Sequence, residues 1–252
     1  MKPLNIAVSG VLLVLLMVLM LPWSGKTAEG PIKEPAPLSQ GLEDSNLSKV
    51  PSPAMPLYRA PKGSVPGGRL KGGTRGGKDF PVIQVLAPNH VGWTRQSQPV
   101  LYWYISKVTQ YPVEFTLVDS RAMEPVIEIR LHQPTAPGIQ AIRLKDYDVS
   151  LEAGVPYRWF ITLVIDSLNP SRDLTAGAVI ERFNYVESLL IFEEDPARLA
   201  SAGLWYDAIR KLSELIEANP NDPYLGMQRA ALLSQVGLPE VAEFDLKRNG
   251  KH

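Results

Sequence analysis

The sequence predicts an all-β sandwich followed by a small α-helical region. Two observations in the chain predict this order. From Phe80 onward, apolar and polar residues alternate for about a hundred residues, with turn-forming residues roughly every ten, which is typical of antiparallel sandwiches. From Leu189 the apolar residues recur at helical spacing instead. We therefore divide the chain into an export segment (1–28), a tether (29–78), the sandwich (79–184) and the helical region (185–248).

The first residues predict export from the cytoplasm. Lys2 precedes an apolar run from Ile6 to Leu21, which is shorter than the roughly 20 residues of a membrane span and is typical of a signal-peptide core. The run Lys26-Thr27-Ala28 is a poor cleavage site, because lysine stands where a small residue is expected. A cleaved signal peptide and an uncleaved N-terminal membrane anchor therefore both stay open. Either one predicts a periplasmic or secreted protein.

Residues 29–78 predict a disordered tether. Eight prolines lie between Pro31 and Pro66, and seven glycines lie between Gly63 and Gly77. Such a segment buries too little apolar surface to offset the entropy lost when it is ordered. Its end carries four positive charges and no negative one. Arg75 in this stretch is a candidate contact for phosphate or for an acidic partner, and a solvated linker is the alternative.

The same stretch contains most of a phosphate-binding loop, in the pattern Gly72-x-x-x-x-Gly77-Lys78. Asp79 stands where that loop needs a serine or threonine to hold magnesium. A strand-like segment follows the pattern, whereas a phosphate-binding loop opens a helix. We therefore expect no nucleotide binding here.

Seven strands are predicted in the sandwich. Each is an apolar or alternating run bounded by turn residues, and the run from Val126, for example, puts Ile127, Ile129 and Leu131 on one face. Their number and spacing predict an antiparallel sandwich like those of immunoglobulin and fibronectin type III domains. The seven runs are residues 82–86, 100–105, 113–118, 126–131, 139–144, 157–165 and 178–183.

The run from Leu151 to Tyr157 predicts a tyrosine corner. In this motif a tyrosine near the start of a late strand turns its hydroxyl back to the chain a few residues upstream. Gly154 allows the tight approach that the turn needs. Trp159, two residues after Tyr157, lies on the same inward face of the strand. We expect these three residues to be structural.

The helical region begins with one amphipathic helix. Asn219 and Pro220 end it, and Asp222 and Pro223 predict the start of a second helix as its N-cap and first-turn proline. Pro239 opens a short last helix. The apolar stripe of the first helix consists of Leu204, Ala208, Leu212, Leu215 and Ile216.

A repeat lies within this region. Gly203-Leu204, followed by Ala208, recurs 34 residues later as Gly237-Leu238, followed by Ala242. This period resembles the tetratricopeptide repeat, in which paired helices grip another protein. About one and a half repeats match, fewer than the three that a free-standing solenoid needs, so we expect the helices to pack against the sandwich. Within the repeat, Trp205 and Tyr206 are candidates for a protein-binding surface.

Several segments resemble an uncharacterised bacterial family, the domain of unknown function nine-two-eight. The matching segments lie in order between residues 58 and 240. The connection between Arg182 and Ala197 is shorter than in that family. The resemblance implies no known activity. The segments are Tyr58-Arg59-Ala60-Pro61, Gly72-Gly73-Thr74-Arg75-Gly76, Leu86–Gly92, Gln98–Tyr104, Pro112–Leu117, Gly154–Trp159 and Ala202–Ala208.

Composition argues against several classes of function. The 26 basic residues balance 26 acidic ones, so no net charge attracts nucleic acid. The chain has no cysteine, which excludes disulfides, thiolate nucleophiles and a lipoprotein anchor. His90, His132 and His252 are not at metal-ligand spacing, and there is no G-x-S-x-G motif. We expect no catalytic residue, no metal and no cofactor, and therefore no enzyme.

The best candidate for small-ligand binding is the aromatic run Tyr102-Trp103-Tyr104. Alternation puts Trp103 on one face and the two tyrosines on the other, where an exposed pair could stack on a sugar ring. Packing beneath neighbouring strands is the alternative. Three functions follow: an exported adaptor that binds another envelope protein, which we favour; a glycan- or cell-wall-binding module; and an enzyme of unrecognised type.

Overall fold

The computed structural model describes residues 55–65, 67–70, 72, 80–183 and 194–249 of the 252-residue chain. All of these belong to one compact unit, Val50–His252. The predicted export segment, the first part of the predicted tether and Arg75 lie outside the described residues. Within the described ranges, no helix combines the length and the apolar character needed to cross a membrane.

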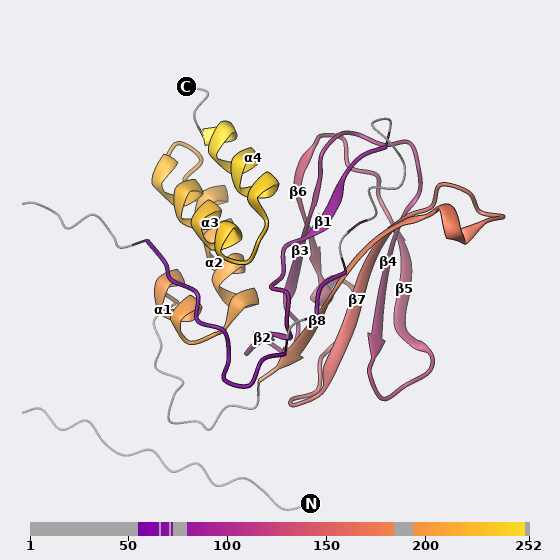
Figure 1. Cartoon of the computed structure of the whole chain (residues 1–252), viewed down its shortest axis with the longest axis horizontal. Coiled ribbons are helices and arrows are strands. Elements are labelled where there is room, and N and C mark those ends of the chain that lie inside the picture. Colours follow the sequence, from indigo (N-terminus) through magenta and orange to yellow (C-terminus); the bar gives the residue numbers. More distant parts are fainter. Residues whose placement is uncertain (1–54, 66, 71, 73–79, 184–193, 250–252) are drawn as a thin grey trace, which may run out of the picture. The chain divides into compact units, whose positions relative to one another are not determined.

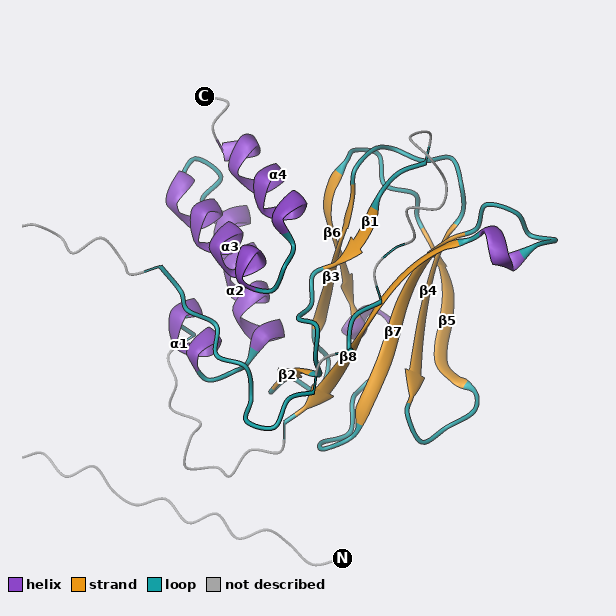
Figure 2. Ribbon diagram, viewed as in Figure 1, coloured by secondary structure: helices purple, strands orange, loops and turns teal. Residues whose placement is uncertain are grey.

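In the described part of the chain, eight strands form two sheets and helices follow them (Figures 1 and 2). The larger sheet has the order β2-β8-β7-β4-β5 and the smaller one the order β1-β3-β6. The strands are β1 Ile83–Val85, β2 Gly92–Thr94, β3 Val100–Ile105, β4 Val113–Asp119, β5 Pro125–Leu131, β6 Gly138–Arg143, β7 Pro156–Leu163 and β8 Leu174–Arg182. Short 3-10 helices lie at Leu144–Tyr147 and Pro170–Arg172.

The seven predicted strands are all present, with small shifts at their ends. The alternation does not predict β2, because Gly92-Trp93-Thr94 is only three residues long and lies among turn residues. This strand pairs with β8 in parallel, with Trp93 opposite Glu181. The other pairings between named strands are antiparallel, as predicted.

The hydrophobic core lies between the two sheets. Its largest fully buried side chains include Trp103 of β3, Phe115 of β4 and Trp159 of β7. Along β4 and β7, every second residue is buried, because successive side chains of a strand point to opposite faces. The predicted period of two therefore places the inward faces of these strands correctly.

The tyrosine corner has the predicted geometry. The Tyr157 hydroxyl accepts a hydrogen bond from the Glu152 backbone N–H at 3.1 Å. Tyr157 and Trp159 are both buried on the inward face of β7. Gly154 has φ +73°, and a Cβ there would meet nothing within 4 Å. The backbone conformation, rather than a close approach, therefore favours glycine at this position.

The end of the first predicted helix before Asn219 and the starts at Pro223 and Pro239 are confirmed, and a short helix that was not predicted, α1, precedes them. Asp195 caps α1, accepting bonds from the N–H groups of Ala197 and Arg198. Asp222 caps α3, accepting a bond from the Tyr224 N–H at 2.9 Å. The helices are α1 Pro196–Ser201, α2 Trp205–Ala218, α3 Pro223–Gln235 and α4 Pro239–Asn249. Of the predicted apolar stripe of α2, Leu204, Ala208, Leu212 and Ile216 are buried and Leu215 is half-buried.

The helices cover the face of the smaller sheet that points away from the larger sheet (Figure 1). Tyr104 of β3 packs against Phe244 of α4 with ring centroids 5.2 Å apart. The Gln84 side chain donates to Glu240 Oε2 at 2.7 Å. β3 is therefore enclosed between the larger sheet on one face and the helices on the other.

Residues 55–70 bind the helices to the sandwich, and we call the described part of this stretch the strap. The Tyr58 N–H donates to Gln235 Oε1 of α3 at 2.8 Å, and Gln235 Nε2 donates to the Pro56 carbonyl at 2.9 Å. The Arg69 guanidinium donates to three carbonyls, those of Ala87, Val236 and Gly237. Leu70 forms an antiparallel bridge with Gly177 of β8. The prediction of a disordered tether is wrong for these residues: a segment without periodicity is ordered by contacts with distant parts of the chain.

Candidate functional site

Trp205 and Tyr206, predicted as a binding surface, lie in the core with exposed fractions of 0% and 2%. The Trp205 indole N–H donates to the Leu86 carbonyl at 2.8 Å. The Tyr206 hydroxyl accepts from the Trp159 indole N–H at 3.0 Å and donates to the Val179 carbonyl at 3.3 Å. The prediction is wrong because the polar atom of each ring is used inside the chain. These two residues dock α2 on the sandwich.

The fit at this junction is close. A Cβ built on Gly92 would lie 2.6 Å from the Tyr206 ring, so β2 must carry glycine where the ring passes. The rings of Trp205 and Tyr58 pack in a T-shaped arrangement with centroids 4.9 Å apart. The ring of Tyr58 stacks in turn on His90. The strap, α2 and the loop after β1 therefore form one packed unit.

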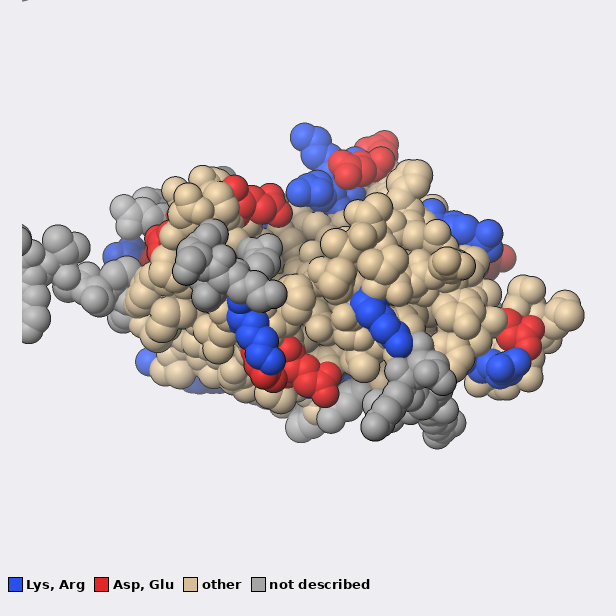
Figure 3. Space-filling model, turned by 90° about the horizontal axis from the view of Figure 1, so that it is seen from above, with Lys and Arg blue, Asp and Glu red and all other residues tan. Residues whose placement is uncertain are grey.

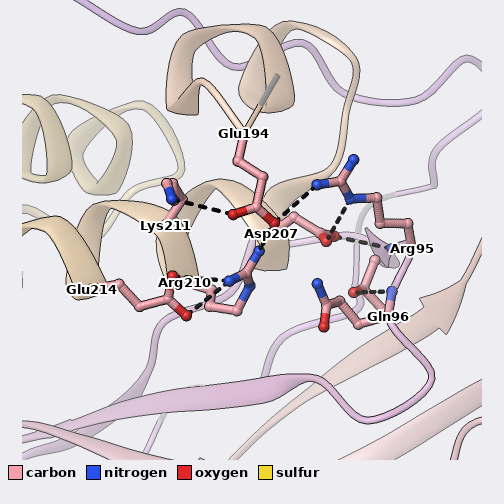
Figure 4. Close-up of polar contacts among 8 residues, drawn as sticks. Arg95, Gln96, Glu194, Asp207, Arg210, Lys211 and Glu214 are labelled. Carbon is pink, nitrogen blue, oxygen red and sulfur yellow. Dashed lines mark hydrogen bonds and ion pairs between the residues drawn. The ribbon is translucent and has the colours of Figure 1, made fainter. Parts of the chain in front are cut away.

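A cluster of charged residues continues the junction along α2 (Figure 4). Asp207 Oδ2 accepts from the Arg95 backbone N–H at 3.0 Å, and Arg95 Nε lies 3.5 Å from Oδ1. Glu194 binds three cations from the neighbouring elements. These cations are Arg95 at 3.3 Å, Arg210 at 2.9 Å and Lys211 at 3.2 Å. Opposite charges therefore face one another, which gives the cluster a structural role.

The two carboxylates of the cluster have shifted pKa values of opposite sign. Burial raises the pKa of Asp207, although the Arg95 N–H, the Thr94 side chain and nearby arginines favour its charged form. Hydrogen bonds from Arg210 and Lys211 lower the pKa of Glu194. Ionisation of Asp207 therefore costs more free energy in the folded state than in the unfolded chain.

Tyr102 and Tyr104, predicted as an exposed pair, are 4% and 7% exposed. They do lie on the face of β3 opposite Trp103, as alternation predicts. The helices cover that face, so the pair cannot stack on a sugar ring. The alternative, packing beneath neighbours, describes them correctly, although helices rather than strands supply the cover.

A polar hollow of about 220 Å³ lies where α2 and α3 meet β3 and β6. Beneath it, the Arg229 guanidinium forms a buried bidentate pair with Asp245, at 2.7 and 2.6 Å. Arg229 also donates to Ser213 Oγ at 2.8 Å, and burial raises the pKa of Tyr102 beside it. The hollow is lined by Tyr102, Ile139, Gln140, Ala141, Arg143, Ser213, Ile216, Glu217 and Arg229. Because the buried polar groups beneath it bind one another, they are best explained as a structural cluster that joins α2, α3 and α4.

Charge gives no sign of a nucleic-acid surface on the face shown in Figure 3. Basic and acidic side chains are interspersed there among uncharged ones. The Arg69 side chain, from the predicted basic stretch, caps the end of α3 instead of facing a partner. Such a surface attracts neither phosphate backbones nor acidic membranes strongly.

Of the edge strands in the described part of the chain, β5 is the longest, and its outer edge is the candidate site. β5 pairs with β4 on one side, and among the described residues no strand pairs with its other side. Figure 1 shows this strand on the side of the larger sheet away from the helices. The strand is seven residues long, Pro125–Leu131. An edge of this length presents a row of backbone donors and acceptors to which another strand can bind.

The side chains of β5 divide into two rows. The inner row, Ile127, Ile129 and Leu131, packs against the core but is only half-buried. The outer row, Val126, Glu128 and Arg130, is exposed, with Val126 at 46%. Arg130 pairs with Glu114 of β4 at 3.2 Å. No inward-pointing charge protects this edge, and Pro125 stands only at its start.

The sequence shows both rows of β5 but not that β5 lies at an edge. Strand order depends on which strands pair, and the local alternation of β4 and β5 is similar. The signal that was present is the mixture of Glu128 and Arg130 on one face, since charged residues are common on edge strands. Of the other predicted site residues, Tyr157, Gly154 and Trp159 form the tyrosine corner, and Arg75 is not described.

Comparison with known proteins gives a family and little else. A family model described as Domain of Unknown Function (DUF928) matches residues 70–246. No curated protein matches the sequence. Among solved structures, a multi-domain immunophilin from Arabidopsis thaliana matches at 10% identity and a TM-score of 0.17, covering 63% of this chain and 98% of that one. A likeness this weak carries no argument about the fold.

Proposed function

The chain belongs to the DUF928 family, whose description names no activity, and we propose that it is an exported, non-enzymatic protein-interaction module of the cell envelope. In this proposal a partner protein adds an extended strand to the outer edge of β5. Backbone hydrogen bonds between the strands give the affinity, and the alternating side chains give the specificity.

The observation that carries the proposal is the contrast between the outer edge of β5 and the other candidate surfaces. Trp205, Tyr206, Tyr102 and Tyr104 are all buried. β5 instead offers seven residues of unpaired edge with a half-buried apolar row. A strand added there would cover more of Ile127, Ile129 and Leu131, which are only partly buried.

The strand order and the helical repeat support a role in protein interaction. The strand order fits an immunoglobulin- or fibronectin-type sandwich, in which β5 would be the outermost strand of the larger sheet. Equivalent positions of the helical repeat behave alike: Gly203 and Gly237 have φ +81° and +73°. Leu204 and Leu238 are 1% and 2% exposed. We interpret the helices as a tetratricopeptide-like pair that serves as a lid on the smaller sheet.

The compartment is part of the proposal and rests on residues 1–28. An apolar run of that length after Lys2 favours export to the periplasm or beyond, with or without cleavage. Protease added to intact cells, and again after permeabilising the outer envelope, tests it. Degradation of the sandwich only after complete lysis would place the protein in the cytoplasm and contradict export.

The glycan-binding alternative loses its support in this structure. It depended on an exposed Tyr102–Tyr104 pair, and both rings are covered by helices. We therefore propose protein binding alone. Glycan binding remains as one possible outcome of the crosslinking experiment that tests it.

A photo-reactive amino acid placed at Val126, on the outer row of β5, tests strand addition in living cells. Tyr147 is 40% exposed, close to the 46% of Val126, and lies in the 3-10 helix after β6, so it is a matched control site. We expect a discrete protein adduct from position 126 and none of that mass from position 147. Adducts of equal yield from both positions, or polysaccharide fragments alone, would contradict the proposal.

A further inference from the structure

We propose that the strand added at β5 is β5 of a second copy of this chain, paired antiparallel about a two-fold axis at Ile129. This inference rests on the proposed function, strand addition at the outer edge of β5, and names the partner. Two copies related by a two-fold axis use the same surface patch on both sides. The pairing therefore has to be self-complementary, and the sequence of β5 can be tested for that property.

Three antiparallel registers keep inner row against inner row near the middle of β5. A register centred on Glu128 places Glu128 opposite itself, and one centred on Arg130 places Arg130 opposite itself. Like charges directly opposite one another destabilise a sheet. The register centred on Ile129 places Glu128 of each copy opposite Arg130 of the other. Only this register pairs opposite charges.

Glu114 of β4 adds to the charge complementarity between the two copies. Arg130 already lies 3.2 Å from Glu114, its cross-strand neighbour on β4. In the dimer, Arg130 would stand between two carboxylates, Glu114 of its own copy and Glu128 of the second copy. Glu128, whose neighbour on β4 is the uncharged Thr116, would gain a cation from the second copy. Each copy thus supplies the charge that the other lacks.

The inner row matches in the same register. Ile129 meets Ile129 of the second copy, and Ile127 meets Leu131. These side chains are half-buried in the single chain, so pairing removes apolar surface from water without exposing a polar group. Residues 127–131, five of the seven residues of β5, lie opposite β5 of the second copy, because the axis lies one residue from its midpoint, Glu128.

The assembly closes at two copies. Pairing through β5 joins the two larger sheets into one sheet, and the outermost strand at each end becomes β2. β2 has three residues and is packed against α2, so it offers little edge for a further copy. Through the edges of the larger sheet, the geometry thus gives a dimer instead of a fibre.

Charge reversal in the full chain tests the register. Glu128→Arg alone and Arg130→Glu alone each place like charges opposite one another twice per dimer. We expect each to raise the dissociation constant of the dimer at least about tenfold, measured by sedimentation velocity. An equimolar mixture of the two variants restores both opposite-charge pairs, so it should dimerise like the unchanged protein. Recovery in the mixture also shows that both variants are folded.

A single cysteine tests the axis directly, because the chain has none of its own. Residues directly opposite in an antiparallel pair have Cα atoms about 4.5–5.5 Å apart, within reach of a disulfide. Ile129→Cys should therefore form a covalent dimer on mild oxidation. Val126→Cys is the matched control, since its own copy would lie about 20 Å away along the strand.

The outcomes separate this inference from the proposed function. A monomeric full chain at high concentration, or a dimer that both charge reversals leave unchanged, overturns the dimer. If Val126 then still crosslinks to a different protein in cells, strand addition stands with another partner. If neither self-association nor a protein adduct is found, both are wrong.

Discussion

The α2 junction and the β5 edge differ in whether the chain itself supplies partners for their polar and apolar groups. At the junction, the polar atoms of Trp205 and Tyr206 reach Leu86, Trp159 and Val179 in the same chain. At the β5 edge, half-buried isoleucines lie on a strand whose outer side pairs with no described strand. Aromatic residues are therefore poor evidence of a binding surface in this protein. The better evidence is a strand whose hydrogen-bonding groups and apolar row are both left incomplete.

The largest expected effect is at the junction. Trp205→Ala removes a fully buried ring and its bond to Leu86, so the free energy of unfolding should fall by about 3–5 kcal/mol. Trp205→Phe keeps most of the ring and should lose less. Urea denaturation of both variants measures this. A loss below about 1 kcal/mol for the alanine variant would mean that Trp205 does not hold the helices to the sandwich.

Removing the hydroxyl of Tyr206 tests a single hydrogen bond of the α2 junction. Tyr206→Phe leaves the buried Trp159 indole N–H without its acceptor, so unfolding should become easier by about 1–3 kcal/mol. Tyr147→Phe, at an exposed tyrosine, serves as control and should change stability little. Equal stabilities of the two variants would show that the hydroxyl of Tyr206 is dispensable.

The junction also predicts a dependence on pH. The pKa of Asp207 is raised in the folded state, so as pH rises the unfolded chain releases this proton first and stability is lost. The stability of the unchanged protein relative to Asp207→Asn should therefore fall between the ordinary aspartate pKa, about 3.9, and the raised value. The slope is at most about 1.4 kcal/mol per pH unit. A relative stability that rises with pH would mean that pairing with Arg95 outweighs burial.

The smallest effect is expected at the edge. Val126→Ala shortens a side chain that is 46% exposed, so the unfolding free energy of the single chain should change by less than about 0.5 kcal/mol. Measured at concentrations where the chain is monomeric, a larger loss would show that Val126 is covered by another part of the chain. That result would remove the β5 edge as a binding site.

Local patterns predict local structure well in this chain. The alternation in β4 and β7 identifies the inward residues Phe115 and Trp159, and Asp222 marks the start of α3. The same patterns fail where a distant segment supplies the environment. Tyr102 and Tyr104 are buried because helices more than a hundred residues later cover β3.

The strap and the candidate site show the same limit. Residues 55–70 have the composition of a tether, and their order depends on Gln235, Val236 and Gly177. For β5 the sequence shows which residues share a face, but its position at the edge follows from the pairing of all strands. Both are global properties, which periodicity in a short window does not contain.

The contacts of the strap also imply an order in which parts of the chain can fold. Tyr58 donates to Gln235, 177 positions further along the chain, so this bond of the strap forms only when nearly the whole polypeptide has been synthesised, whereas the stacking of Tyr58 on His90 can form earlier. If the N-terminus enters a translocation channel first, the strap crosses before the helices that it binds. The sandwich can fold before then, but the strap can bind α3 only after α3 has emerged. A molecule halted short of its last helices would therefore keep a loose N-terminal segment, open to proteases that the finished protein resists.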